Sequence, residues 1–297
     1  MNSPDHPSLP SRRRFLSGLA AVPFAATFAR AAAKPAYTVG CFTRPWADLE
    51  PEGTLDAIAE AGFTVAGLMS AKGGTIVRAE TAPERIRAIA AHARGRGLSV
   101  ASLYAGDFLV PGDSAASSDR LRRIIAHAVT CGCPTMILGG TTNPKHVDAY
   151  YETVGACCDH AAASGVTLMV KPHGGTNSTG AQCRKLVERV NHRAFRLCYD
   201  PGNILYYSDG RLDPVDDAAT VDGLVVAMCV KDFLPPKVVD VTPGDGRVDF
   251  TRVLARLRQG GFTSGPLIVE CLAKGDRAFV GGEARRARAF LGKLTAG

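Results

Sequence analysis

The sequence lacks several patterns that would assign a chemistry directly. Its nine cysteines include no CxxC pair and no Cys/His spacing of the kind that binds zinc. The net charge is only +7, and residues 1–33, with four Arg and one Asp, account for +3 of it. With no basic helix or aromatic–basic surface in evidence, the sequence argues against a nucleic-acid partner. It contains a single tryptophan, Trp46, and no apolar stretch suited to a stable membrane span.

The amino terminus carries a clear local signal. Residues 11–16 read SRRRFL, which resembles the twin-arginine export motif, and a modestly apolar stretch follows up to Phe28. Ala31–Ala33 then provides small residues for cleavage. We expect a signal peptide over residues 1–33, a mature domain over residues 34–297, and export to the periplasm or beyond by the twin-arginine machinery. A disordered basic tail and an uncleaved anchor are the alternatives.

From residue 37 onward, apolar runs alternate with amphipathic segments. Strands are expected at residues 37–42, 63–69, 98–104, 135–138, 167–170, 195–199, 224–230 and 267–271. Strict strand–helix alternation calls for a parallel sheet with right-handed crossovers, and eight units match a closed (β/α)8 barrel. An open doubly wound sheet would carry a glycine-rich nucleotide motif after its first strand, but residues 43–46 contain no glycine. We predict an α/β fold, a single (β/α)8 TIM barrel, with no nucleotide cofactor.

The last four of these strands are followed by polar residues. The carboxyl ends of barrel strands line one mouth, where reactions occur, and residues two apart on a strand leave the same face. We therefore expect one shared pocket. It would be lined by Lys171 and His173, by Asp200 with Asn203, by Cys229 with Lys231 and Asp232, and by Glu270.

Each of these residues also has a plainer interpretation. Glu270 ends an apolar run, where a carboxylate is costly unless it is paired, which favours a role in the site. Asp200 precedes Pro-Gly-Asn and is also typical of an Asx turn. Asp232 is alternatively a salt-bridge partner, and Trp46 either covers the barrel end or forms an aromatic wall for a sugar ring. The residues expected to bind substrate are Trp46, Asn203, Lys231 and Asp232.

These motifs resemble those of a known family. The Asp200–Asn203 turn, Glu270 within Leu-Ile-Val-Glu-Cys, and Cys229-Val-Lys-Asp are similar to patterns of the xylose isomerase-like barrels. That group includes sugar phosphate isomerases and epimerases and is also associated with endonuclease IV. The resemblance covers nearly all of residues 37–295. It implies that strands five to eight supply Glu, Asp, His and Glu to a divalent metal, often manganese, and that the glutamates move a substrate proton.

Two of the four ligand positions depart from this pattern. Lys171 stands where the first glutamate is usual, and Cys229 stands where the histidine is usual. In one interpretation His173 replaces the lost ligand and forms a metal site with Asp200, Glu270 and Cys229. In the other, the Lys171 ammonium occupies the region of the cation and the protein needs no metal.

We expect a sugar isomerase or epimerase that removes a proton next to a carbonyl and forms an enediolate. Glu270 would be the base, Lys171 or a metal would stabilise the oxyanion, and His173 and Asp200 would position it. Export disfavours a phosphorylated substrate, so a free sugar or sugar derivative is expected. A lyase acting on a keto-glycoside by the same first step and a non-catalytic carbohydrate-binding barrel are alternatives. A metal-dependent DNA-repair enzyme is a weaker alternative, given the modest charge.

Overall fold

The structure, a computed structural model, describes Met1 and residues 37–296. The expected leader, residues 1–33, lies outside the described residues apart from Met1, so export stays a prediction. Residues 37–296 belong to one compact unit. Among residues 37–296, no helix combines the length and apolar character that crossing a bilayer requires.

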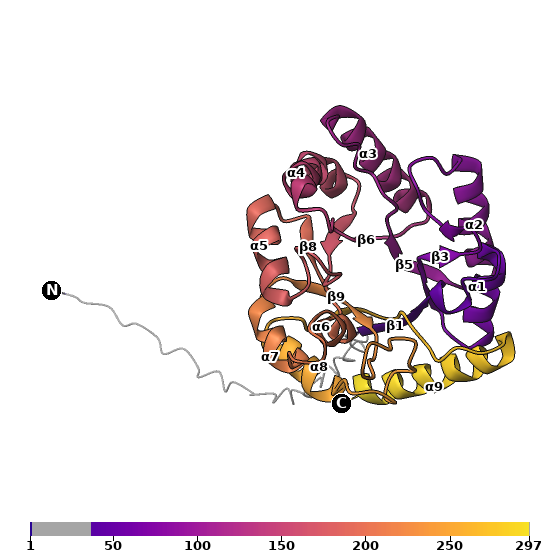
Figure 1. Cartoon of the computed structure of the whole chain (residues 1–297). Helices are drawn as coiled ribbons and strands as arrows, with labels where there is room; N and C mark the ends of the chain where they lie inside the picture. Colours follow the sequence, from indigo (N-terminus) through magenta and orange to yellow (C-terminus); the bar gives the residue numbers. More distant parts are fainter. Residues whose placement is uncertain (2–36, 297) are drawn as a thin grey trace. The chain divides into compact units, whose positions relative to one another are not determined.

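Eight parallel strands close into a barrel, which confirms the predicted (β/α)8 fold. The barrel closes because β1 pairs in parallel with β10 on one side and with β2 on the other. Figure 1 shows the strands at the centre with the helices around them. The strands are β1 Tyr37–Phe42, β2 Val65–Leu68, β5 Ser99–Tyr104, β6 Thr135–Leu138, β7 Thr167–Val170, β8 Phe195–Tyr199, β9 Val225–Val230 and β10 Gly265–Val269.

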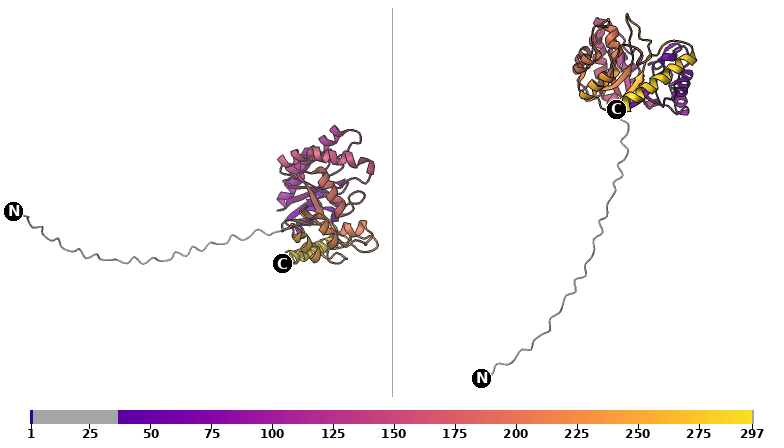
Figure 2. Two further views of the ribbon diagram at one scale, coloured as in Figure 1. Left: turned by 90° about the vertical axis from the view of Figure 1, so that its left-hand side faces the viewer. Right: turned by 90° about the horizontal axis from the view of Figure 1, so that it is seen from below.

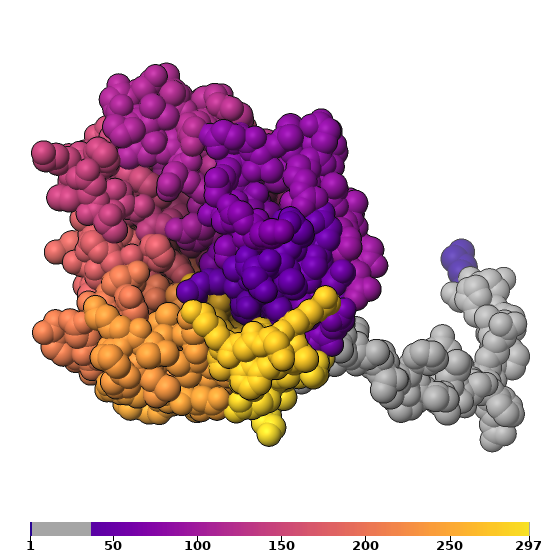
Figure 3. Space-filling view, turned by 45° about the vertical axis from the view of Figure 1, so that its right-hand side comes forward, coloured from indigo at the N-terminus to yellow at the C-terminus, as the bar shows by residue number. Residues whose placement is uncertain are grey.

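The helices cover the outside of the barrel, as the two further views in Figure 2 also show. In the space-filling view of Figure 3, the yellow carboxyl-terminal helix lies beside the indigo first units, so the ring of helices closes. The helices are α1 Pro51–Glu60, α2 Pro83–Gly95, α3 Ser114–Thr130, α4 Val147–Ala163, α5 Gly180–Val190, α6 Pro201–Tyr207, α7 Pro214–Ala218, α8 Phe250–Gln259 and α9 Arg277–Ala296.

Two local features differ from the sequence-based expectation. A short hairpin, β3 Ser70–Ala71 and β4 Gly74–Thr75, follows β2. Helix α6 directly follows β8, where a loop was expected. The side chain of Asp200 caps it by accepting from the Asn203 N–H at 2.9 Å, and Pro201 occupies its first turn. The local turn at Asp200 is therefore a helix start.

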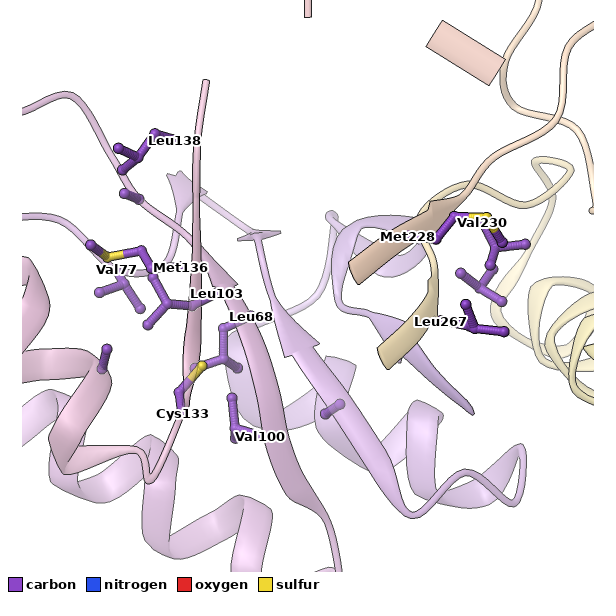
Figure 4. Packing of buried hydrophobic residues seen from close by; sticks show 14 of the residues in the cluster. Leu68, Val77, Val100, Leu103, Cys133, Met136, Leu138, Met228, Val230 and Leu267 are labelled. Atoms are coloured by element: carbon purple, nitrogen blue, oxygen red, sulfur yellow. The ribbon is translucent and has the colours of Figure 1, made fainter. Parts of the chain in front are cut away.

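The strands bury one set of residues toward the helices and another set inside the barrel. Leu68, Leu103 and Met136 belong to the large core between strands and helices, part of which Figure 4 shows. A second cluster contains only residues of the strands or directly beyond them: Phe42, Met69, Ile137, Met169, Cys198, Ala227, Cys229 and Ile268. This inner cluster fills the barrel, and it fixes which later residues point inward.

Candidate active site

Four charged residues continue the inner cluster beyond the strand ends. Each lies two positions after an inner-cluster residue, so its side chain leaves the same face of the extended chain. The pairs are Met169 and Lys171, Cys198 and Asp200, Cys229 and Lys231, and Ile268 and Glu270. All four charged residues are at most 4% exposed. The alternation of the strands therefore brings two ammonium groups and two carboxylates together at the carboxyl end of the barrel.

The four groups form a closed set of ion pairs. The Lys171 Nζ lies 2.5 Å from Glu270 Oε2 and 3.1 Å from Asp200 Oδ2. The Lys231 Nζ lies 2.5 Å from Glu270 Oε1 and 3.2 Å from Asp200 Oδ2. Each carboxylate thus contacts both ammonium groups, and both oxygens of Glu270 are engaged. These contacts are what permits four buried charges at the end of apolar strands.

Two further polar residues extend this set toward the pocket. The Asn203 Oδ1 accepts from Lys231 Nζ at 3.1 Å, while its Nδ2 donates to the Pro172 carbonyl at 2.6 Å. Arg44 Nη1 lies 3.6 Å from Glu270 Oε1, and Arg44 Nη2 lies 3.9 Å from Asp240 Oδ1. The four buried charges balance one another, so Arg44 gives the floor of the pocket additional positive charge. Such a floor favours an electron-rich or negatively charged oxygen.

The pKa values follow from these contacts. Burial raises the pKa of Glu270, but Lys171, Lys231 and Arg44 outweigh it and hold that pKa well below its usual range. Burial lowers the pKa of Lys171, but Cys229, Glu270 and Asp200 raise it well above its ordinary value. Burial also raises the pKa of the Cys229 thiol well above its usual range, so this thiol is neutral at pH 7. Glu270 and Asp200 are therefore the negative charges that keep Lys171 protonated at that pH.

A pocket of about 330 Å³ opens above these groups, and a sugar ring fits the aromatic and polar character of its wall. Lys171, Lys231, Glu270 and Asn203 lie on it, as the sequence predicted for one shared site, whereas Asp200 and Cys229 do not line it. Sequence reasoning missed several other residues of its wall, among them Arg44, Tyr104 and Tyr207. For Arg44 a signal existed, since it lies two residues after the inward-facing Phe42.

His173 also lines this pocket, between two tyrosines. Its ring centre lies 6.1 Å from that of Tyr104 and 6.3 Å from that of Tyr207. Burial, with further help from the positive charge of Lys171, lowers the pKa of His173 to about 4. At neutral pH the imidazole is therefore uncharged. Burial also raises the pKa of both phenols, so they keep their protons.

Asp232 was expected to contact substrate, and its placement disagrees with that expectation. It follows the inward-facing Lys231 by one residue, so its side chain points away from the barrel axis, and it is 0% exposed. Its carboxylate accepts from backbone N–H groups at 2.8–3.0 Å, those of Phe233, Gly244, Gly246 and Val248. Asp232 therefore organises the loop after β9, and the alternation of the strand already contained this information.

Trp46 likewise does not line the pocket. It ends a short 3-10 helix, Arg44–Trp46, and is 1% exposed within the core between strands and helices. Its place in this core and its absence from the pocket lining argue against an aromatic wall for a sugar formed by Trp46. The aromatic side chains at the pocket are those of Tyr104, Tyr206 and Tyr207.

The donors for a divalent metal are only partly assembled. Within residues 37–296, ligand atoms of Asp200, Cys229 and Glu270 lie within 4.8 Å of one another, and His173 is not part of this group. The Lys171 Nζ contacts all three, at 3.1, 4.0 and 2.5 Å. A divalent cation about 3 Å from an ammonium would be repelled by roughly 11 kcal/mol at an effective dielectric of about 20. The residues present therefore do not fit the predicted metal site of His173, Asp200, Glu270 and Cys229.

Comparison with known proteins agrees with the fold. The model of one family, the xylose isomerase-like TIM barrel, matches residues 55–294. No match was found among curated proteins. Among solved structures, a D-psicose 3-epimerase shares 16% identity over 88% of this chain and 100% of its own, with a TM-score of 0.69.

Two other solved structures are similar at the same level. A xylose isomerase domain protein from Planctomyces limnophilus has 18% identity and a TM-score of 0.66, covering 88% of this chain and 96% of its own. A 3-keto-D-glucoside 4-epimerase from E. coli has 15% identity and a TM-score of 0.63, covering 86% and 99%. At such identities the likeness establishes the fold alone.

Proposed function

Because this chain belongs to the xylose isomerase-like TIM barrel family, we propose that it is a sugar epimerase or isomerase. Its substrate would be a non-phosphorylated sugar or sugar derivative with a carbonyl group. The observation that carries the proposal is the buried set of Glu270, Lys171 and Lys231 at the floor of the pocket. It combines a carboxylate that can take a proton with two fixed donors for the oxygen that becomes negative.

The first step is removal of the proton on the carbon next to the carbonyl. As the substrate enters, its oxygens compete with Glu270 for the two ammonium groups. Each contact that Glu270 loses raises its pKa toward the ordinary range, which makes it a better base. Glu270 takes the proton, the C–H electron pair forms a new C=C bond, and the π electron pair of the carbonyl moves onto its oxygen. Lys171 and Lys231 donate to the resulting enediolate.

The second step returns a proton. Delivery to the same carbon from the opposite face gives an epimer, and delivery to the neighbouring carbon gives an isomer. His173 follows β7, which is three strands from β10 around the barrel, so it approaches the pocket from a different wall than Glu270. Both phenols beside His173 are protonated, and we assign the proton donation to Tyr207, because the charges of Lys231 and Lys171 would stabilise its phenolate. Water then restores the proton of Tyr207 and accepts the proton that Glu270 removed.

Similar solved structures include epimerases of free sugars and of a keto-glucoside, which supports this substrate class. No observation favours the elimination that a lyase would perform, and it is not proposed. The direct test is incubation of residues 34–297 with non-phosphorylated keto-sugars and keto-glucosides, followed by NMR identification of the products. An epimer or isomer of any of them is expected. Saturable binding without any conversion would instead identify a non-catalytic carbohydrate-binding barrel.

A further inference from the structure

We propose that the Lys171 ammonium is a built-in replacement for a divalent cation, and that together with Lys231 it binds two adjacent oxygens of the substrate. The identity of the ligand in this inference rests on the proposed function. The placement of the Lys171 ammonium at the cation position does not. The ligand class is an α-hydroxy ketone and the enediolate derived from it.

The position of the ammonium carries the first part of the argument. Asp200, Cys229 and Glu270 are the cluster of potential metal-binding residues among residues 37–296. The Lys171 Nζ lies among these donor atoms, at hydrogen-bond distance from both carboxylates and 4.0 Å from the Cys229 Sγ. Only 1% of the lysine side chain is exposed, so the ammonium group is held out of bulk solvent by its contacts with the carboxylates. A protein cation therefore holds the place that the donors define.

The second part concerns the ligand. The two oxygens of the single Glu270 carboxylate bridge the two ammonium groups, Oε2 to Lys171 and Oε1 to Lys231, each at 2.5 Å. The ammonium groups are thus spaced to receive a pair of oxygens held close together in one plane. The two oxygens of a cis-enediolate have this character, as do adjacent oxygens of oxalate.

The contacts of Asp200 indicate how the two ammonium groups are kept in place. Asp200 directs one oxygen to the Asn203 N–H and the other to both lysines. Helix α6, which Asp200 caps, therefore anchors the carboxylate, and the carboxylate anchors the ammonium groups. Oxygens of a substrate can then be exchanged for those of Glu270 without moving the cations, since Asp200 continues to hold them.

The test compares manganese binding by wild type, K171Q and K171E, each purified as residues 34–297. Mn²⁺ affinity is measured by calorimetry and metal content by elemental analysis after dialysis. Wild type is expected to bind no stoichiometric manganese at a metal concentration of about 1 mM, the weak end of the affinities known for protein calcium sites. K171E, which replaces the ammonium with a carboxylate, is expected to bind at least 100-fold more tightly than wild type, and K171Q is expected to fall between them.

Stoichiometric manganese in wild type would overturn the inference. So would a folded K171E, verified by circular dichroism, with no gain over wild type, because Lys171 would then not be what keeps the cation out. If K171E does not fold, K171Q must still exceed wild type for the inference to stand. A wild type that binds no metal and converts no sugar would contradict the proposed function while leaving the cation replacement intact.

Oxalate binding tests the ligand part separately. Wild type is expected to bind oxalate in the presence of EDTA, and K171Q and K231Q are each expected to weaken it by 10-fold or more. Oxalate affinity that requires added manganese, or that is unchanged in both variants, would refute the assignment of the two lysines as the oxygen-binding pair.

Discussion

Glu270 is the residue on which the site depends. It ends an apolar strand, and it is 3% exposed, a placement that a carboxylate tolerates only with opposite charges around it. Lys171, Lys231 and Arg44 supply those charges. The sequence indicated that Glu270 needed a partner, because it stands alone at the end of the run Leu-Ile-Val. The sequence did not indicate that the partners are three cations, because these side chains come from strand ends that are distant from Glu270 in the sequence.

Replacing Lys231 with methionine should destabilise the protein substantially. The change leaves Asp200 and Glu270 with one buried cation fewer, which typically costs about 3–5 kcal/mol. Urea unfolding of wild type and K231M measures the difference. The matched control is K237M, which removes an exposed ion pair to Asp209 and should have a much smaller effect on stability. Equal effects of the two substitutions would contradict the account of the ion-pair set.

His173 should make stability depend on pH in a defined window. Its folded pKa of about 4 lies below the ordinary 6.5, so between these values the unfolded chain binds more protons than the folded one. Stability is therefore expected to fall as the pH is lowered from about 6.5 to 4. H173Q should flatten this slope in unfolding free energies measured at pH 7, 5.5 and 4.5. His127, whose burial also lowers its pKa, contributes equally in both proteins. If stability falls equally steeply with pH in H173Q and in wild type, His173 is not the source of this pH dependence.

At the scale of elements, the carboxyl end of β9 shows how the alternation of a strand determines which side chains face the barrel interior. Its inward residues, Cys229 and Lys231, face the pocket side, and the next residue, Asp232, faces the loop. The eight strands and this alternation were readable from the sequence. Helix α6 was not, because Asp-Pro-Gly-Asn is typical both of a turn and of a helix start, and only the contacts of Asp200 distinguish them.

Asp232→Asn should loosen the loop after β9 without touching the pocket. The carboxylate is the acceptor for the N–H groups of Gly244, Gly246 and Val248, and the amide nitrogen of asparagine cannot accept. A cost of about 1–3 kcal/mol is expected for the acceptor lost. Asparagine keeps one acceptor oxygen, so amide hydrogen exchange should accelerate either at Gly244 and Gly246, which bond to Oδ2, or at Phe233 and Val248, which bond to Oδ1. Asp240→Asn, in the same loop but partly exposed, is the control and should leave that exchange slow.

At the scale of the whole molecule, the sequence determined the barrel and the shared mouth but left the metal question open. Lys171 could be recognised as a departure, yet whether His173 would compensate depended on distances between strands. The structure keeps His173 out of the group of donors and places Lys171 within it. The motifs alone were enough to recognise the family. The charge state of the site could be inferred only from the packing of β7, β8, β9 and β10 around one point.

Export by the twin-arginine route stays a prediction, and it rests on residues 1–33. We expect the leader to direct a fused reporter into the periplasm of a bacterium that has the twin-arginine machinery, and R12K/R13K to retain it in the cytoplasm, since the motif requires both arginines. Fractionation with an activity assay of the reporter measures this. The conservative control R30K, outside the motif, should export normally. Equal export of R12K/R13K would point to another route or to none.

The central claim is that Glu270 removes a proton next to a substrate carbonyl while protein cations stabilise the product. Its most direct measurement is deuterium incorporation from D₂O into a keto-sugar substrate, followed by NMR in the presence of EDTA, for wild type and Glu270→Gln. We predict exchange at the carbon beside the carbonyl in wild type and a loss of 100-fold or more in the variant, the scale of general-base catalysis. Exchange at an unchanged rate in Glu270→Gln, or exchange that EDTA abolishes in wild type, would contradict the account.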